Sequence, residues 1–576
     1  MDKQKLVKLI NVASGKDEAD FVIKNCKIVD VFNAKIIEQD IAIVDGMIAA
    51  IGNYDGKNIV DAKGKYVSPG FIDGHVHIES SCTSPEEFGK ITIPHGTTTI
   101  IADPHEIANV CGLDGVRYMI NASKRVALDI KMMLPSCVPA TPFENAGAII
   151  DADKMQEIIE DDDILGLGEF MNYPGIINAD DSCIDKLLLS RKYNKLVDGH
   201  SPALMGNGLN AYAAALIRAD HECATVEEMH DRLSRGMYVI LRQGSACHNL
   251  RPLLKGLTNE NKRRCLFCTD DCQARTVLSI GHIDNSIRIA SQEGFDPLTC
   301  IQMASLNAAE CFGLKDRGAI APGLRADLVF LEDLESFKVT DVYIKGEHVA
   351  QDGKYLKEIE KYDPSITYPS MGVKNFSASR LGLKIKSDKA YVIGIVPGGV
   401  VTEKLVCEIT KDEDDNFIFD PSRDIAKIVV VERHHNTGNI GIGLIKGYGI
   451  KTGAVALSIA HDSHNIIAVG VSDEDIEFAV NKLIEQRGGI VVTKDKEVLA
   501  HMEMPIAGLM SDQSGEFVAR GIEEIHEIAH NELGISREIE AVMTLCFMAL
   551  PVIPELKLTD MGLFDVSAFD FLDINA

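Results

Sequence analysis

The segment SPGFIDGHVHIESS (Ser68–Ser81) places two histidines, His75 and His77, at the end of an apolar run that starts from a Pro-Gly pair. On an extended backbone, alternate side chains point to the same face, so both imidazoles face the same way. The pair indicates either a shared ligand or a polar loop that holds two histidines by accident. The rest of the chain has to decide between these two interpretations.

Residues 69–316 alternate short β-rich apolar runs with helical, charge-rich stretches. Eight such runs end at polar residues or turns about every 28 residues, which is roughly the repeat of an eight-fold strand–helix barrel of about 250 residues. The sixth run, IRADHECA, is the weakest of the eight. The pattern predicts an α/β fold with a (β/α)8 TIM-type barrel, in which the GHVH segment is the first strand.

The segments on either side of residues 69–316 have a different sequence pattern. Short apolar segments broken by turn residues fill residues 1–68 and return in 317–362, which predicts one small β domain built from both ends of the barrel segment. Residues 366–576 mix strand-like runs with amphipathic helices and predict a separate C-terminal α/β domain. A chain of 576 residues is too long for a single hydrophobic core, so several domains are expected.

The formal net charge is −28, which argues against a nucleic-acid backbone or an anionic membrane as partner, although an uncharged nucleobase stays possible. The N-terminal residues do not resemble a signal peptide, and no apolar stretch reaches transmembrane length. Fourteen cysteines without a disulfide framework predict a cytoplasmic protein with reduced thiols. The run CLFCTDDC, with Cys265, Cys268 and Cys272, could ligate a metal or cluster, but we expect a buried structural strand.

Barrel enzymes carry their sites at the carboxyl ends of the strands. Polar residues that follow the eight runs are His75, His77, Asp103, His105, Glu106, Glu169, His200, His221, Glu222, Arg242, Gln243, Asp270 and Asp271. A lone histidine is more often a hydrogen-bonded structural group than a ligand, and Asp103 and Glu106 could simply fix a loop. Glu169, in the apolar setting ILGLGEFM, is harder to explain, because a buried carboxylate is costly unless it is paired or bound to a cation. Together these residues predict a divalent metal site.

Four histidines and two carboxylates are too many for one tetrahedral ion and suit two ions with a bridging group. His75, His77 and Asp270 are expected to hold one ion, and His200 and His221 the other, with Glu169 as the bridge. Nitrogen and oxygen ligands without thiolate favour Mn, Fe or Zn. Asp271 is expected to be a helix N-cap or a second-shell hydrogen-bond acceptor rather than a ligand.

The combined motifs resemble the amidohydrolase superfamily and, within it, the bacterial adenine deaminase family. The resemblance rests on PGFIDGHVHIESS, HGTTTIIADPHEIANVCG, GLGEFMNYPGI, DGHSPAL, ADHECAT, CTDD and GHIDN, and continues into the C-terminal region in VVERHHNTGNIGIGLIKGYGIKTGAVALSIAHDSHNIIAVG and PIAGLMSDQ. It therefore covers essentially the whole chain. A bare H-x-H is shared by many hydrolases, whereas the combined set is specific.

The resemblance implies hydrolytic deamination of adenine to hypoxanthine and ammonia in purine salvage, with adenine and water as substrates. It implies two divalent ions per subunit, Mn²⁺ or Fe²⁺ with Zn²⁺ possible, whose ligands are His75, His77, Glu169, His200, His221 and Asp270. Glu169 stands where many relatives carry a carboxylated lysine, and the H-x-E with P-C-x-x-C signature of zinc deaminases is absent. A homo-oligomer, a dimer or larger, is also expected.

In the expected mechanism, metal-activated hydroxide attacks C6 of the purine, and Asp270 transfers a proton to the leaving amine. Glu106 is the candidate acid for a ring nitrogen. Expected substrate-binding or second-shell residues are Asp103, His105, Asp271, Arg242, His461 and His464. Rival hypotheses are another amidohydrolase acting on a cyclic amide, such as a dihydroorotase-like or imidazolone hydrolase, and a non-catalytic scaffold, although no expected ligand is missing.

The C-terminal motif HDSHN places His461 and His464 three residues apart. It could form a second metal site, but a local hydrogen-bond network is the favoured interpretation. We predict that this loop and the ERHHNTG loop cover the barrel mouth and help to exclude water.

Overall fold

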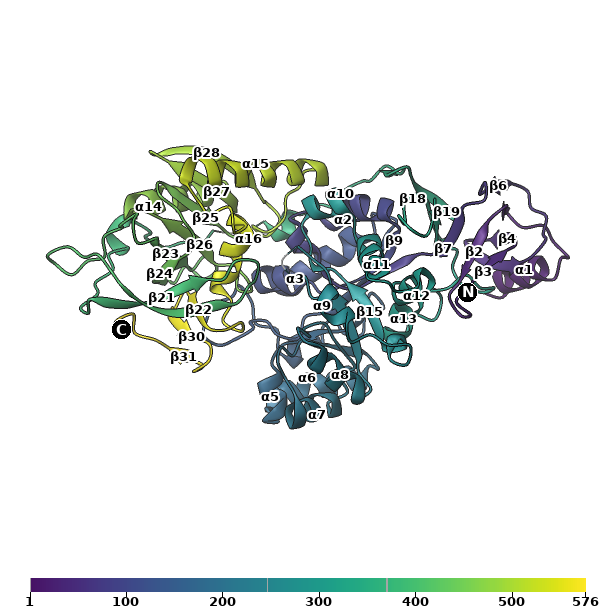
Figure 1. Cartoon of the computed structure of the whole chain (residues 1–576), viewed down its shortest axis with the longest axis horizontal. Helices are drawn as coiled ribbons and strands as arrows, with labels where there is room; N and C mark the ends of the chain where they lie inside the picture. Colours follow the sequence, from purple (N-terminus) through teal and green to yellow (C-terminus); the bar gives the residue numbers. More distant parts are fainter. Residues whose placement is uncertain (1, 246, 369–370) are drawn as a thin grey trace.

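The strand that carries the GHVH segment, β8 (Phe71–His77), lies inside a curled parallel sheet in the middle of the chain (Figure 1). The structure is a computed structural model that describes residues 2–245, 247–368 and 371–576. The six-stranded sheet has the order β12-β11-β10-β9-β8-β16, and all its neighbouring strands run parallel. The other strands of this sheet are β9 (Thr97–Ala102), β10 (Asp129–Leu134), β11 (Ile164–Phe170), β12 (Leu196–Gly199) and β16 (Asp270–Asp271).

A second parallel sheet continues the first. Its order is β13-β14-β15, with β13 (Ala219–Asp220), β14 (Tyr238–Arg242) and β15 (Cys265–Cys268). A Cβ added to Gly74 in β8 would lie 2.7 Å from Leu266 Cδ1 in β15, and one added to Gly199 in β12 would lie 2.4 Å from the carbonyl oxygen of Ala219 in β13. Both edges of the small sheet therefore touch the large one. The weak sixth run is a real strand, but β13 is only two residues long.

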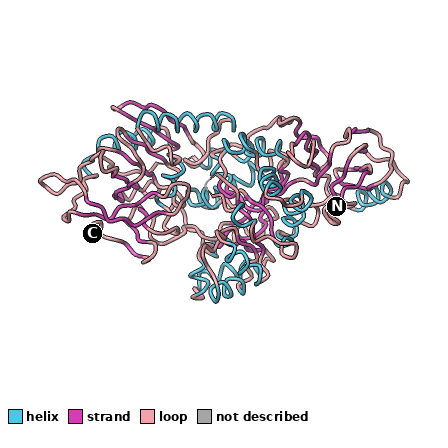
Figure 2. The backbone as a smooth tube through the Cα atoms, viewed as in Figure 1, coloured by secondary structure: helices cyan, strands magenta, loops and turns pink. Residues whose placement is uncertain are grey.

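Helices alternate with these strands and lie around them (Figure 2). They are α2 (Pro85–Thr92), α3 (His105–Ser123), α4 (Ala152–Met155), α5 (Tyr173–Ile177), α6 (Asp181–Lys192), α7 (Gly206–Ala214), α8 (Val226–Ser234), α9 (Leu250–Leu254), α10 (Ala274–Ile280), α11 (Ile283–Gln292), α12 (Pro297–Met303) and α13 (Leu306–Cys311). Several start at side-chain caps, for example Asp180 before α6 and Thr225 before α8. The predicted alternation of parallel strands and helices is present.

The segments before and after this region share a seven-stranded sheet with the order β20-β19-β18-β17-β7-β2-β3. Its strands are β2 (Lys27–Asp30), β3 (Lys35–Glu38), β7 (Tyr66–Pro69), β17 (Leu328–Leu331), β18 (Val339–Ile344), β19 (Glu347–Gln351) and β20 (Lys354–Tyr355). Antiparallel pairing of β7 with β17 joins the two segments. The helix α1 (Lys3–Ala13) packs on a four-stranded sheet of β1 (Phe21–Lys24), β4 (Ile41–Val44), β5 (Met47–Ile51) and β6 (Ile59–Asp61).

The C-terminal region is built on an eight-stranded sheet with the order β22-β21-β24-β23-β26-β25-β27-β28. Its strands are β21 (Lys389–Ile395), β22 (Thr402–Glu408), β23 (Ile425–Val431), β24 (Ile440–Lys446), β25 (Ala454–Leu457), β26 (Ile466–Gly470), β27 (Gly489–Lys494) and β28 (Glu497–Glu503). The helices α14 (Asp473–Glu485) and α15 (Gly515–Leu533), both expected from sequence, pack on it. The short helix α16 (Ala541–Cys546) and the strands β29 (Leu556–Thr559), β30 (Gly562–Asp565) and β31 (Asp570–Phe571) complete the region.

The C-terminal region packs directly on the central one. The helix α15 contacts α2 and α10, and the backbone N–H of Gly515 donates to Glu87 Oε2 at 3.2 Å. Thr83 and Ser511 form an isolated parallel β-bridge. The carboxyl ends of the central strands therefore lie close to C-terminal loops.

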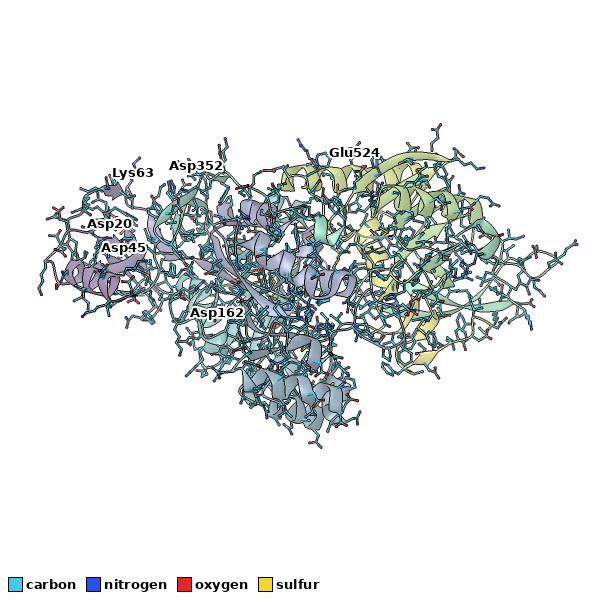
Figure 3. The ribbon with its side chains drawn as sticks, turned by 180° about the vertical axis from the view of Figure 1, so that it is seen from behind. Asp20, Asp45, Lys63, Asp162, Asp352 and Glu524 are labelled. Carbon is cyan, nitrogen blue, oxygen red and sulfur yellow. The ribbon has the colours of Figure 1, made fainter. Side chains whose placement is uncertain are left out.

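Many charged side chains lie at the periphery of the molecule, among them Asp162, Asp352 and Glu524 (Figure 3). Within the described residues, no helix combines the length and the apolar character that crossing a membrane would need.

Candidate metal centre

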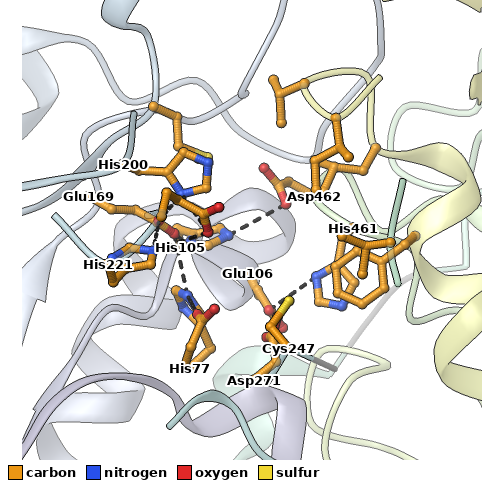
Figure 4. Close-up of a pocket in the computed structure, with 18 of the residues that line it drawn as sticks. His77, His105, Glu106, Glu169, His200, His221, Cys247, Asp271, His461 and Asp462 are labelled. Atoms are coloured by element: carbon orange, nitrogen blue, oxygen red, sulfur yellow. Dashed lines mark hydrogen bonds and ion pairs between the residues drawn. The ribbon is translucent and has the colours of Figure 1, made fainter. Parts of the chain in front are cut away.

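Five of the six ligand residues predicted from sequence line one pocket (Figure 4), and the sixth, His75, contacts His77. They come from β8, β11, the residues directly after β12 and β13, and β16. All are buried except His200, which is half-buried; the converging side chains are His75, His77, Glu169, His200, His221 and Asp270. Side chains from five different strand ends thus meet at one edge of the parallel sheets.

His75 and His77 turn their Nε2 atoms toward each other, 3.0 Å apart. Asp270 Oδ1 lies 3.1 Å from His77 Nε2 and 3.6 Å from His75 Nε2. The outer nitrogens have partners that accept hydrogen bonds: His75 Nδ1 lies 3.0 Å from Asp198 Oδ2, and His77 Nδ1 lies 2.9 Å from the carbonyl oxygen of Asp103. With a hydrogen on each Nδ1, each Nε2 would present a lone pair to a cation. Buried lone pairs that face one another in this way fit a cation among them.

Glu169 lies between two groups of imidazoles. Its Oε1 is 3.3 Å from His77 Nε2 and 3.3 Å from His105 Nδ1. Its Oε2 is 2.6 Å from His200 Nδ1 and 3.2 Å from His221 Nε2. Burial raises the pKa of Glu169, but the neighbouring histidines outweigh burial and hold this pKa well below its usual range. One carboxylate with an oxygen toward each group has the geometry of a bridge.

Arg242 and Glu222 form a charged wall beside these ligands. Arg242 Nη1 contacts Glu222 and lies 2.6 Å from Asp270 Oδ2. Glu222 Oε1 lies 3.7 Å from His200 Nδ1 and 3.6 Å from His221 Nε2. Arg242 therefore fixes the second oxygen of Asp270 and balances part of the negative charge. Gln243, the next residue, bonds to His248 Nδ1 instead.

Asp198 is absent from the site residues predicted from sequence, and Glu222 was named at a strand end without a role. Asp198 orients His75, and Glu222 approaches two histidines. Asp198 stands two residues before His200, the same spacing that drew attention to the first histidine pair. Glu222 stands directly beside His221. The contacts of Asp198 with His75 and of Glu222 with His200 join different strand ends, so no local pattern predicts them.

A second group of polar residues faces these ligands across the pocket. The Ser80 hydroxyl lies 2.5 Å from Asp271 Oδ1 and 3.2 Å from Glu106 Oε1. Glu106 Oε1 also lies 3.1 Å from Nδ1 of His461, which belongs to the C-terminal region. The neighbouring Asp462 reaches His105, with Oδ1 at 3.5 Å from Nε2. Both halves of the chain thus contribute to one pocket.

The pocket has a polar side, formed by the residues described above, and an apolar side. C-terminal residues form the apolar side: Val400, Phe547, Leu550, Val552 and Ile553. The His461 ring stacks on Phe547, with ring centroids 4.5 Å apart and an interplanar angle of 14°. The HDSHN loop does reach the pocket. The ERHHNTG loop also contacts the central region, where His435 Nε2 lies 2.7 Å from the carbonyl oxygen of Ala146.

Known proteins match the whole chain. A family model described as "Amidohydrolase family" matches residues 66–349, and one described as "Adenine deaminase C-terminal domain" matches residues 399–570. "Adenine deaminase 2" of Desulfotalea psychrophila is 61% identical over 576 residues, covering 100% of both chains. "Adenine deaminase" of Ligilactobacillus salivarius is 53% identical and covers 99% of both chains. The chain belongs to the adenine deaminase family.

Solved structures are similar to about three fifths of this adenine deaminase family member. An enamidase of the amidohydrolase superfamily has a TM-score of 0.44 at 20% identity, over 60% of this chain and 98% of its own. An adenosine deaminase from Xanthomonas campestris with bound zinc has a TM-score of 0.45 at 16% identity, over 59% of this chain and 95% of its own.

Cysteine ligation receives no support from the described residues. Cys265 and Cys268 lie in β15, and both are fully buried, as the structural interpretation of the CLFC run predicted. Cys272 is buried too. Within residues 2–245, 247–368 and 371–576, the side-chain groups that could hold a metal ion contain only histidine, aspartate and glutamate.

Proposed function

We propose that the chain hydrolyses adenine to hypoxanthine and ammonia, a reaction of purine salvage. The observation that supports this proposal most strongly is Glu169, a buried carboxylate with two imidazoles at each oxygen, in a chain that is 61% identical over its full length to a protein named adenine deaminase. The apolar side of the pocket around Phe547 suits a small aromatic base.

We propose that the two parallel sheets form one eight-stranded barrel, in which β15 and β16, separated by a single residue, count as one strand. Both edges of the small sheet touch the large one. Residues 69–316 would form this barrel, residues 1–68 and 317–362 the small β domain, and residues 366–576 the C-terminal α/β domain. The shared seven-stranded sheet supports the division, because it pairs strands from both sides of the barrel segment.

Two divalent ions fit the residues present. His75, His77 and Asp270 would hold one ion, and His200 and His221 would hold the other, with Glu169 between them. The facing lone pairs and the buried His221 Nδ1 and His105 Nδ1, which lack hydrogen-bond partners, support a cationic centre. Nitrogen and oxygen donors suit Mn²⁺ or Fe²⁺, with Zn²⁺ as an alternative. When bound, such ions lower the pKa of water so that hydroxide is available near neutral pH.

Asp270 is placed to move protons during the reaction. Its Oδ1 faces the His75–His77 pair, while Arg242 holds its Oδ2. Its backbone has φ of +59°, a left-handed conformation that is costly for a non-glycine residue and that turns the side chain into the pocket. Asp270 would accept the proton of the attacking water and pass it to the leaving amine.

The proton for the purine ring would come from the side of the pocket that faces the proposed metal ligands. Ser80 contacts both Asp271 and Glu106, yet its hydroxyl carries only one hydrogen. Both contacts are satisfied when one of the two carboxyl groups is protonated and donates to the Ser80 oxygen. Glu106, Ser80 and Asp271 therefore form a chain that can hold a proton beside the substrate. Within this proton-holding chain, Glu106 contacts His461 of the HDSHN loop.

Replacing Ser80 by alanine should break this proton-holding chain. We expect kcat for adenine to fall roughly tenfold to a hundredfold, because general acid catalysis contributes about 10²–10⁴-fold and the carboxyl groups themselves stay in place. Steady-state ammonia release measures the effect. The control is Ser81→Ala, since the Ser81 hydroxyl bonds to the Ile78 carbonyl and to Thr83 rather than to a carboxylate. Equal turnover of the two variants would remove Ser80 from the mechanism.

A substrate panel tests the proposed function itself. The full-length protein, loaded with Mn²⁺, is incubated with adenine or with cyclic amides such as dihydroorotate and imidazolone propionate. We expect ammonia and hypoxanthine from adenine and no ring opening of the amides. Ring opening without adenine turnover would assign the chain to another amidohydrolase reaction.

A further inference from the structure

A second buried cluster of possible metal ligands lies outside the proposed binuclear centre. It consists of Glu106, in the first turn of α3, and His461 and His464, in the loop between β25 and β26. One ligand atom from each lies within 4.8 Å of the others, and all three residues are buried. In Figure 4, Glu106 and His461 lie across the pocket from Glu169 and His200.

His464 is the unusual member of this cluster. It is fully buried, and neither of its ring nitrogens has a hydrogen-bond partner. Its Nε2 lies 4.0 Å from Glu106 Oε2, which also lacks a hydrogen-bond partner. Leaving a buried polar group without a partner is unfavourable, so two such groups facing each other indicate that something polar belongs between them.

An ion pair alone does not account for the cluster. A protonated His461 beside Glu106 would explain their 3.1 Å contact. It would leave both nitrogens of His464 and the second oxygen of Glu106 without partners. Burial lowers the pKa of His464 well below its usual value, and His461 and Arg433 lower it further. Metal binding requires the neutral form of both imidazoles.

We propose that Glu106, His461 and His464 bind a third divalent transition-metal ion, separate from the binuclear centre. Two imidazoles and one carboxylate are a ligand set typical of Zn²⁺ with one open position, and Mn²⁺ accepts the same donors. The ion would join helix α3 of the central region to the β25–β26 loop of the C-terminal region.

Charged and titratable groups surround the cluster. The buried guanidinium of Arg433 disfavours a cation here, because its Nε donates to the carbonyl oxygen of His464. Two further carboxyl groups lie beside Glu106. Asp271 shares Ser80 with Glu106, and the buried Glu79 accepts from the backbone N–H of Ile107, the residue after Glu106. Burial and the neighbouring Glu106 raise the pKa of Glu79 to about 8, so Glu106 is the carboxylate that supplies negative charge to a cation at this position.

The third ion would also decide which carboxyl group of the proton-holding chain carries the proton. An ion on Oε2 keeps Glu106 ionised and leaves its Oε1 toward Ser80. The proton of the chain would then rest at the Asp271 end. The binding of the ion itself does not depend on adenine being the substrate, so a failure of the proposed function leaves this proposal open to test.

The test is a metal count on the full-length protein. Protein loaded with Mn²⁺ and dialysed is analysed by inductively coupled plasma mass spectrometry, next to His464→Asn and His526→Asn. His526, in α15, is the matched control, because it is also buried with both ring nitrogens unpartnered but belongs to none of the candidate ligand groups. We expect three ions per chain in the parent protein and in His526→Asn, and two in His464→Asn.

The proposal is overturned if the parent protein and His464→Asn hold the same number of ions, or if His526→Asn loses one as well. Anomalous X-ray scattering from crystals of the Mn²⁺-loaded parent protein needs no variant and covers the case in which His464→Asn does not fold. A peak between Glu106, His461 and His464 is expected. Peaks at the binuclear centre without one at this position would contradict the third site.

Discussion

Asp270→Asn is expected to lower kcat for adenine by about 10²–10⁴-fold, the range that proton transfer by a positioned side chain contributes. Asparagine keeps the shape of the side chain but cannot accept the proton of the attacking water. It also leaves Arg242 with Glu222 as its remaining carboxylate partner, because the contact to Asp270 Oδ2 loses its charge. Steady-state kinetics of ammonia release measure the loss, and circular dichroism checks that the fold is retained.

A matched control separates this role from a general effect of removing a buried charge. Asp284 is a buried aspartate that accepts from the backbone N–H of His282 and contacts His95, away from the pocket. Asp284→Asn should keep near-normal turnover at a temperature where it is folded. Near-normal turnover of Asp270→Asn would show that another group moves the proton.

Glu169→Gln is expected to have an effect of similar size for a different reason. The glutamine amide offers one oxygen and one N–H₂ group, so it cannot present an acceptor to His77 and His105 on one side and to His200 and His221 on the other. We expect the binuclear ions to be lost on dialysis and turnover to fall by roughly 10²–10³-fold or more, as when a major electrostatic contribution to catalysis is removed.

The measurement pairs metal analysis with activity for Glu169→Gln. The third ion at Glu106 should stay, so the variant is expected to hold one ion per chain while it loses the other two. Glu169→Asp is the companion variant, since it keeps the charge and shortens the side chain. If Glu169→Gln kept its full metal content and its turnover, a bridging role would be excluded.

The sequence predicted the parallel-stranded core because its signals are local. A period of two placed His75 and His77 on one face, and the regular spacing of apolar runs placed Glu169, His200 and His221 at strand ends. All of these side chains do meet at one edge. The weakest run became β13, a strand of only two residues, and two hydrogen-bonded residues leave little pattern in the sequence.

Contacts between distant segments could not be read in the same way. Glu106 and His461 stand far apart in the sequence, and so do His105 and Asp462, yet both pairs meet across the pocket. The order of the C-terminal sheet, with β21 between β22 and β24, is likewise set by long-range pairing that no local pattern records. The sequence therefore left open whether HDSHN held a metal ion or a local network.

Metal-dependent ammonia release from adenine tests the central claim most directly. The full-length protein is stripped with a chelator, reconstituted with increasing Mn²⁺, and assayed for ammonia and hypoxanthine. The proposed function predicts that the stripped protein is inactive, that Mn²⁺ restores activity, and that the two products form in equal amounts. Ammonia release that persists in the stripped protein, or its absence after full reconstitution, would contradict the claim.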